Sequence, residues 1–194
     1  MLKKATILIP YIIFLLAAHS SWGQESQPDF RKAGWGMTSA EVKESEASKP
    51  AQEMSKGLKQ LIIYKDNIGG LPCDIIYIFA YDKLVRAEYS ITATHSSKAE
   101  YLTDFHSLVS TLNEKYGNPS NQDTYWQNDL KNDDDAQYSE SEVKGRLNKY
   151  TTWATATSNI TLYLSGDSSE ISLGIQCSSK ELASLDEKAD AAEE

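Results

Sequence analysis

The sequence predicts an α+β domain in which an antiparallel sheet carries two main helices on one of its faces. Two helix starts share one capping pattern, the first at Thr38 and the second at Ser97. Segments in which apolar and polar residues alternate strictly, such as 84–92 and 159–165, indicate half-exposed strands. Turn residues separate these segments, and short turns favour antiparallel pairing.

Residues 1–23 are typical of a cleaved secretory signal peptide. Lys3 and Lys4 precede an apolar run of about 14 residues, which is shorter than the roughly 20 residues that a bilayer requires. The alternative is an uncleaved membrane anchor. No cysteine lies near the expected cut before Gln24, which excludes a lipidated N-terminal cysteine. We therefore expect a periplasmic or secreted protein without a lipid anchor and with no transmembrane segment after cleavage.

The charge of the expected mature chain excludes some kinds of partner. Cleavage removes two lysines and no acid, which leaves 17 basic and 28 acidic residues and a formal charge of −11. An acidic surface repels phosphate backbones and anionic lipid headgroups. We therefore expect no binding to nucleic acid and no attachment to an anionic membrane surface.

The first half of the domain begins with a capped helix. Thr38 and Glu41 form a capping box that predicts a helix from Ser39 to near Ala47, before Pro50. Three strands are expected after this helix, at residues 58–64, 73–80 and 84–92. The second of these strands is apolar on both of its alternating sets, a pattern that is typical of a strand covered on both faces.

The second half repeats this order. Ser97 and Glu100 form another capping box, and apolar residues at helical spacing continue to Tyr116, just before Gly117 and Pro119. We expect a short strand around Trp126, then a long acidic loop. A three-stranded meander is expected to follow at 150–156, 159–165 and 170–177.

The order of elements predicts one domain over residues 29–177, followed by an acidic C-terminal tail at 178–194. The tail is expected to be a frayed helix or unstructured. A capped helix followed by a meander occurs twice, which favours a tandem repeat of helix plus meander. The alternative is that helix and hairpins are simply a common combination in α+β domains.

Cys73 and Cys177 are candidates for a disulfide, because an exported protein meets an oxidising environment. The bridge would close a loop of about 100 residues and stabilise the domain by about 4 kcal/mol. Two free, buried thiols that act as small hydrophobic residues are the alternative.

The candidate binding residues lie in the acidic stretch 123–142. Aromatic residues near the ends of elements can anchor a partner, and closely spaced carboxylates can attract a cation. The segment does not follow the order of residues in a calcium-binding loop, because the glycine that such a loop requires is missing. The candidates are Tyr125, Trp126, Asp133, Asp134, Asp135 and Tyr138.

Catalytic and metal-binding motifs are missing from the sequence. A triad of Asp104, His106 and Ser107 fails because neighbouring helical residues point about 100° apart. No zinc-ligand spacing and no phosphate-binding glycine loop is present. We therefore expect no catalytic residues, no metal site and no cofactor.

The residues Trp35-Gly36-Met37-Thr38, followed by Glu41 and Val42, resemble the helix start of small exported bacterial modules of the β-lactamase-inhibitor-protein-like fold. This group includes small outer-membrane lipoproteins that help to assemble β-barrels. The segment from Phe30 to Met37 is also similar to exported proteins of uncharacterised function. The resemblance implies an exported α+β interaction module with tandem repeats, and it transfers no binding site.

Together these observations lead to the hypothesis of an exported, non-enzymatic interaction module whose partner is another envelope protein. The first alternative is an exported protein that binds a small ligand or a cation through the acidic loop. A second alternative is an enzyme that uses paired carboxylates or a tyrosine, because such pairs are visible only in a fold.

Overall fold

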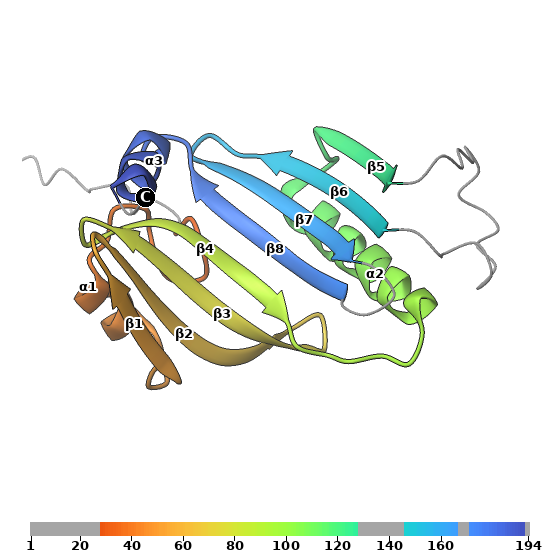
Figure 1. Ribbon diagram of the computed structural model, residues 1–194, viewed down its shortest axis with the longest axis horizontal. Coiled ribbons are helices and arrows are strands. Elements are labelled where there is room, and N and C mark those ends of the chain that lie inside the picture. Colours follow the sequence, from red (N-terminus) through yellow and green to blue (C-terminus); the bar gives the residue numbers. More distant parts are fainter. Residues whose placement is uncertain (1–27, 128–145, 167–170, 193–194) are drawn as a thin grey trace, which may run out of the picture.

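The computed structural model describes residues 28–127, 146–166 and 171–192. Its elements, in chain order, are α1 (Ser39–Ser45), β1 (Gln52–Lys56), β2 (Lys59–Ile68), β3 (Leu71–Ala80), β4 (Lys83–Ile91), α2 (Lys98–Tyr116), β5 (Asn121–Gln127), β6 (Arg146–Ala154), β7 (Ser158–Gly166), β8 (Ile171–Ser179) and α3 (Ala183–Ala191). The strands form one antiparallel sheet in the order β1-β2-β3-β4-β8-β7-β6-β5 (Figure 1). The predicted α+β class is confirmed, and the sheet is its dominant part.

The sheet consists of two meanders that meet at the pairing of β4 with β8. In each half one helix precedes four strands, α1 before β1–β4 and α2 before β5–β8. The expectation of three strands in the first half was wrong, because it omitted β1. All five residues of β1 are exposed, so this edge strand carries no apolar alternation and is held by its backbone pairing with β2.

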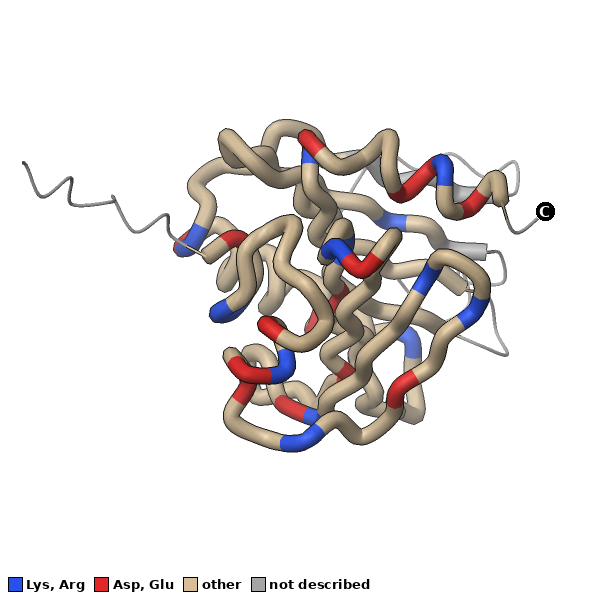
Figure 2. The backbone as a smooth tube through the Cα atoms, turned by 90° about the vertical axis from the view of Figure 1, so that its left-hand side faces the viewer, with Lys and Arg blue, Asp and Glu red and all other residues tan. Residues whose placement is uncertain are grey.

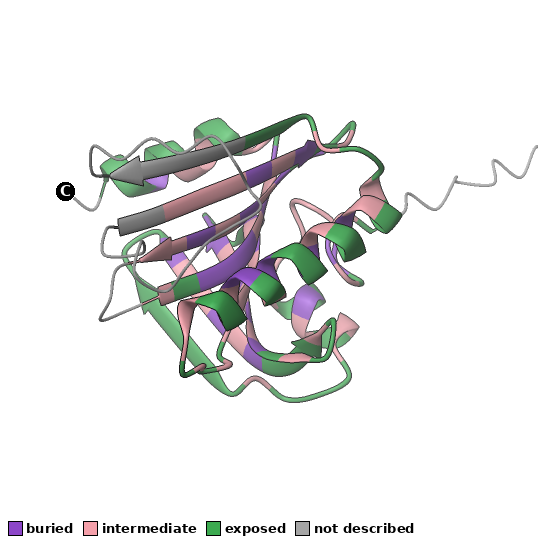
Figure 3. Ribbon diagram, turned by 90° about the vertical axis from the view of Figure 1, so that its right-hand side faces the viewer, coloured by how far each residue is buried: buried purple, intermediate pink, exposed green. Residues whose placement is uncertain are grey.

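Helices α1 and α2 cover the same face of the sheet, which we call the inner face. Most of the buried residues of the strands pack with buried residues of α1 and α2 in one hydrophobic cluster, and Figure 3 shows α2 lying across this face of the sheet. One continuous core fills this layer and spans both meanders. From the helices it includes Val42, Leu102, Phe105, Leu108 and Leu112.

Both predicted capping boxes are present, and they explain where the two helices begin. The carboxylate of Glu41 accepts a hydrogen bond from the backbone N–H of Thr38 at 2.7 Å, and the Glu41 N–H donates to Thr38 Oγ1. The backbone N–H of Ser97 donates to the carboxylate of Glu100 at 3.0 Å. These bonds lower the pKa of both glutamates, because they favour the charged form.

The C-terminal segment, expected to be a frayed helix or unstructured, contains the helix α3. This helix packs on β3 and β4 at one end of the opposite face, which we call the outer face. None of the helices in the described part of the chain is long and apolar enough to cross a membrane.

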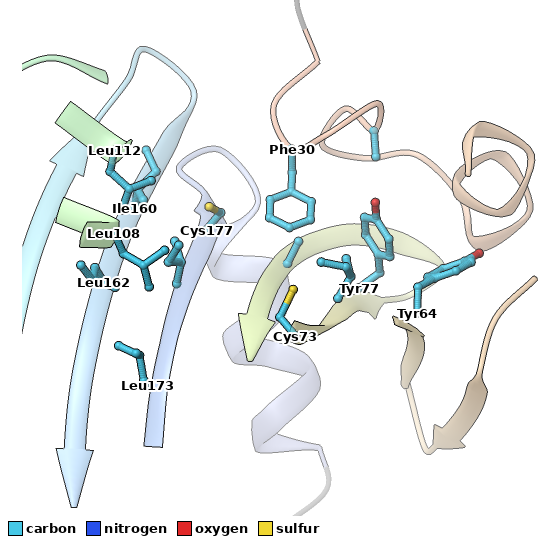
Figure 4. Packing of buried hydrophobic residues seen from close by; sticks show 14 of the residues in the cluster. Phe30, Tyr64, Cys73, Tyr77, Leu108, Leu112, Ile160, Leu162, Leu173 and Cys177 are labelled. Atoms are coloured by element: carbon cyan, nitrogen blue, oxygen red, sulfur yellow. The ribbon is translucent and has the colours of Figure 1, made fainter. Parts of the chain in front are cut away.

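The two cysteines do not form the candidate disulfide. Cys73 on β3 pairs with Ile91, whereas Cys177 on β8 pairs with Ala87, so the whole of β4 and a register offset of four residues separate them. Figure 4 shows the two side chains on different strands of the core. Both are free and buried, which is the alternative that the sequence left open.

Candidate functional site

The outer face is the surface of the fold that the helices leave largely uncovered. In an antiparallel pair, residues directly opposite each other share a face, so the register defines rows of side chains across the sheet. One row runs through Met54, Leu61, Ile78, Arg86 and Ser178. The next runs through Gln52, Ile63, Ile76, Glu88, Gln176 and Thr161. In these two rows the residues on β1–β3 are aliphatic, with the exception of Gln52, and those from β4 onwards are polar.

In the described residues, no helix or strand packs over the aliphatic half of this face. Leu61, Ile63 and Ile76 are half-buried. Within the part of the chain that the structure describes, they belong to neither packed hydrophobic cluster. Met54 lies beside Leu61 and is 42% exposed. Apolar side chains that are contiguous and uncovered mark interaction surfaces in soluble proteins.

This patch corrects the interpretation of β3 from its sequence. An apolar pattern on both alternating sets predicted that the strand is covered on both faces. The inner set, Cys73, Ile75, Tyr77 and Phe79, is buried, but among the described ranges no helix packs on Ile76 in the outer set. Ile78 and Ala80, at the end of the strand, pack in one hydrophobic cluster with residues of α3.

A corner of exposed large hydrophobic residues adjoins the patch. Met54 is joined by Leu58 in the β1–β2 turn (40% exposed) and Tyr81 in the β3–β4 turn (45%), where the Tyr81 N–H donates to the Leu58 carbonyl at 3.0 Å. Tyr81 and Asp82 both have positive φ, 52° and 54°, without the glycine that such a turn normally takes. Asp82 accepts a hydrogen bond from the Ser39 N–H at the start of α1, which fixes this turn.

The polar half of the outer face is ordered by one tyrosine. Tyr163 on β7 lies across Gly174 on β8, and its hydroxyl donates to Glu88 on β4. A Cβ atom on residue 174 would lie 2.5 Å from the Tyr163 hydroxyl, so glycine is required there. Burial and the hydrogen bond to Glu88 both raise the pKa of Tyr163. The hydroxyl therefore stays protonated at neutral pH and holds the carboxylate in place.

Two small hollows lie beside these features. One of about 190 Å³ is lined by Arg86, Thr161, Gln176 and residues of α3. The other, of about 310 Å³, lies beside Trp35 and the β6–β7 turn. Small-molecule sites usually have volumes of roughly 300–1,000 Å³, so both are at or below the lower limit.

A largely buried charged cluster lies on the inner face. Arg31 forms a two-pronged ion pair with Glu46, whose side chain is only 5% exposed, at 2.9 and 3.2 Å. It also binds Asp66 at 2.8 Å, and the Tyr77 hydroxyl donates to Glu46. Burial, together with Glu46, raises the pKa of Tyr77. This network fastens the segment before α1 to β2 and β3, and we assign it a structural role.

A histidine–carboxylate pair fixes the connection into α2. His95 Nε2 lies 2.5 Å from Asp104 Oδ2, and the histidine ring packs edge-on against Tyr101. The sequence argues against a pairing of Asp104 with His106 on the same helix. In the structure, Asp104 pairs with His95, which precedes the helix. In the described ranges, no group of three or more His, Cys, Asp or Glu side chains is arranged to hold a metal ion.

The structure describes only part of the site predicted from the sequence. Tyr125 and Trp126 lie on β5, the edge strand, where they pair with Asn148 and Leu147. Asp133, Asp134, Asp135 and Tyr138 lie outside the described residues. The aliphatic face was missed, although its signal was present in the second apolar set of β3.

The fold and this surface define an α+β protein with one helix-covered sheet face and one largely open, partly aliphatic face. Comparison of the chain with protein-family models, with curated proteins and with solved structures found no match.

Proposed function

We propose that this chain is an exported, non-enzymatic module that binds another envelope protein through the aliphatic half of its outer face. The observation that carries the proposal is that Leu61, Ile63 and Ile76 lie side by side on an eight-stranded sheet, where no other element of the described chain packs over them. Burial of such side chains by a partner is favourable by roughly 25 cal/mol per Å².

Two further features support the same surface. The exposed corner of Met54, Leu58 and Tyr81 supplies protruding anchor residues, and tyrosine is enriched among residues that dominate binding energies. The strained turn that presents Tyr81 is stabilised by the contact between Asp82 and α1. Strain of this kind is concentrated at functional sites. Export to the cell envelope is proposed from the N-terminal sequence alone.

The proposal is tested with a photo-cross-linking amino acid introduced at Ile63 of the full chain in the cells that produce it. We expect one discrete adduct with another protein. The matched control carries the same group at Thr103, an exposed position on α2 in the opposite layer, and should give no adduct.

A charge introduced in the patch should remove the complex without unfolding the domain. We expect Ile63→Glu to abolish the adduct formed by a cross-linker at Met54, while the circular dichroism spectrum is unchanged. Identical adducts from Ile63 and Thr103, or an intact complex in Ile63→Glu, would contradict the assignment of this face.

A further inference from the structure

The C-terminal helix α3 occupies one end of the outer face. Ala189 is buried there, and Leu182 and Leu185 pack with it over the aliphatic end of β3 and β4. The residues beneath are Ile78, Ala80 and Val85. The aliphatic patch and the surface under α3 are continuous, because Leu61 pairs directly with Ile78. The chain therefore covers part of this surface with a segment of its own.

A charged clamp fixes the position of α3. Lys59, only 9% exposed, lies 3.0 Å from Asp186 and also binds Asp190, one helical turn further on. Arg86 lies 3.1 Å from the other carboxylate oxygen of Asp186. Burial opposes the charge on Lys59, but the hydrogen bonds to Asp190 and Asp186 outweigh it, so the pKa of Lys59 is raised. Figure 2 shows acidic and basic positions interspersed over this end of the molecule.

The helix has little stability of its own. It has nine residues, its N-cap residue Leu182 makes no capping bond through its side chain, and Ala189 is its only buried residue. Isolated helices of fewer than about 12–15 residues are marginal in water. Docking therefore supplies most of the stability of α3. Detachment would uncover Ile78 and Val85 without breaking the pairing of any strand.

We propose that α3 is a displaceable cover of the binding face, and that the face accepts an acidic amphipathic helix from the partner in its place. This inference rests on the proposed function. The recognised pattern is the one that α3 itself presents, an aliphatic stripe beside two carboxylates four residues apart. Lys59 and Arg86 supply the complementary charge, and Ile78 and Val85 supply the apolar floor.

The test uses a labelled synthetic peptide of residues 180–192 and the full chain. In the variant Leu182→Asp/Leu185→Asp, the helix of the chain should detach, and the peptide should bind in its place. The unaltered chain should bind the peptide at least about tenfold more weakly, because its own α3 competes for the surface. A control peptide with Asp186→Asn and Asp190→Asn should bind the variant at least about tenfold more weakly than the acidic peptide.

Equal binding of the peptide to the variant and to the unaltered chain would overturn the inference, as would failure of the folded variant to bind it. A second measurement does not depend on the variant. In the unaltered chain, backbone amides of α3 should exchange with solvent at least about tenfold faster than those in the centre of β8. Equal protection would show that α3 opens only with global unfolding. The adduct at Ile63 tests the binding face separately, since that position lies outside α3.

Discussion

Gly174 shows how a single missing Cβ atom organises the polar half of the outer face. A methyl group there would meet the Tyr163 hydroxyl at 2.5 Å and the Tyr89 backbone oxygen at 2.9 Å. We expect Gly174→Ala to lower the free energy of unfolding by about 1–3 kcal/mol, because both neighbours must move in a packed sheet. Denaturant unfolding of the purified domain measures this difference.

The matched control is Gly34→Ala, where the new methyl group would lie at an ordinary 3.7 Å from Asp29. It should change stability by less than about 0.5 kcal/mol. Removal of the tyrosine ring in Tyr163→Ala/Gly174→Ala should recover part of the loss, so that the two changes are not additive. Strict additivity would show that Tyr163 does not lie over Gly174.

Among the charged residues, we expect Arg31 to contribute most to the free energy of unfolding. In Arg31→Met, Glu46 stays buried beside Tyr77 without its cation, so we expect a loss of about 3 kcal/mol in unfolding free energy. The backbone strain at this position, φ 55°, is unchanged by methionine. Thermal and denaturant unfolding measure the effect.

Lys43→Met provides the comparison, because Lys43 pairs with Glu53 on the surface at 3.1 Å with both side chains well exposed. Exposed pairs contribute roughly 0–1 kcal/mol. If Arg31→Met costs no more than Lys43→Met, the buried network does not fasten the N-terminal segment.

Contacts between individual residues could be predicted only where the two partners are close together in the sequence. The capping boxes at Thr38 and Ser97 could be predicted because their partners are three residues away and the chemistry is local. The contact of Arg31 with Glu46 spans 15 residues, and that of Tyr163 with Glu88 spans 75. Nothing in the sequence indicates such pairs, since they exist only once the strands are in register.

At the scale of elements, the periodic segments were predicted, whereas β1 was omitted and α3 was expected only as a frayed helix or an unstructured tail. Helix α2 has apolar residues at helical spacing, and strands β4, β7 and β8 alternate between apolar and polar residues. Each of these elements agrees with its predicted segment within a few residues. Strand β1 is wholly exposed, and only Ala189 of α3 is buried. Both elements depend on surfaces that other parts of the chain provide, which a single sequence pattern does not contain.

The docking of α3 should depend on pH in a defined way. The hydrogen bond from Lys59 lowers the pKa of Asp190, so this contribution is present above the ordinary value of about 3.9 and is lost as the pH falls through the lowered pKa. The pKa of Lys59 is raised, so its contribution to docking is fully present below the ordinary lysine pKa of about 10.4. This contribution is lost as the pH rises through the raised pKa. Docking should therefore be strongest between about pH 4 and pH 10.

Hydrogen exchange, corrected for the intrinsic rate at each pH, measures this dependence. Protection of the α3 amides should decrease from pH 7 to about pH 3 while protection in β8 is largely retained. In Asp190→Asn, the protection of the α3 amides should change less between pH 7 and about pH 3. A constant α3 protection over this range in the unaltered chain would show that the Lys59 clamp does not hold the helix.

At the scale of the whole molecule, the two meanders are expected to unfold as one unit. They share the pairing of β4 with β8, and a single core cluster includes residues from both halves. Trp35 adds a further connection, since its indole N–H donates to Ser158 on β7 at 2.9 Å. A repeated arrangement of elements therefore does not imply two independently stable halves, because each half would expose its part of this core.

The two thiols provide a probe for each half, Cys73 in the first meander and Cys177 in the second. Burial raises the pKa of Cys73 to about 11 and that of Cys177 to about 12, so little thiolate exists at neutral pH. A thiol reagent should react with either group only after the sheet opens. In Cys73→Ala and Cys177→Ala, the remaining thiol should therefore be labelled at rates that agree within about threefold, after correction for the stability of each variant.

Because the register keeps the two sulfur atoms on different strands with β4 between them, a reducing agent should leave the melting temperature unchanged. Labelling of Cys73 that is at least about tenfold faster than that of Cys177 would show that the first meander opens alone. That outcome would also change the interpretation of the outer face, because its aliphatic half lies in the same meander as Cys73. Equal rates would instead mean that the aliphatic patch is presented by a sheet that stays closed until the whole domain unfolds.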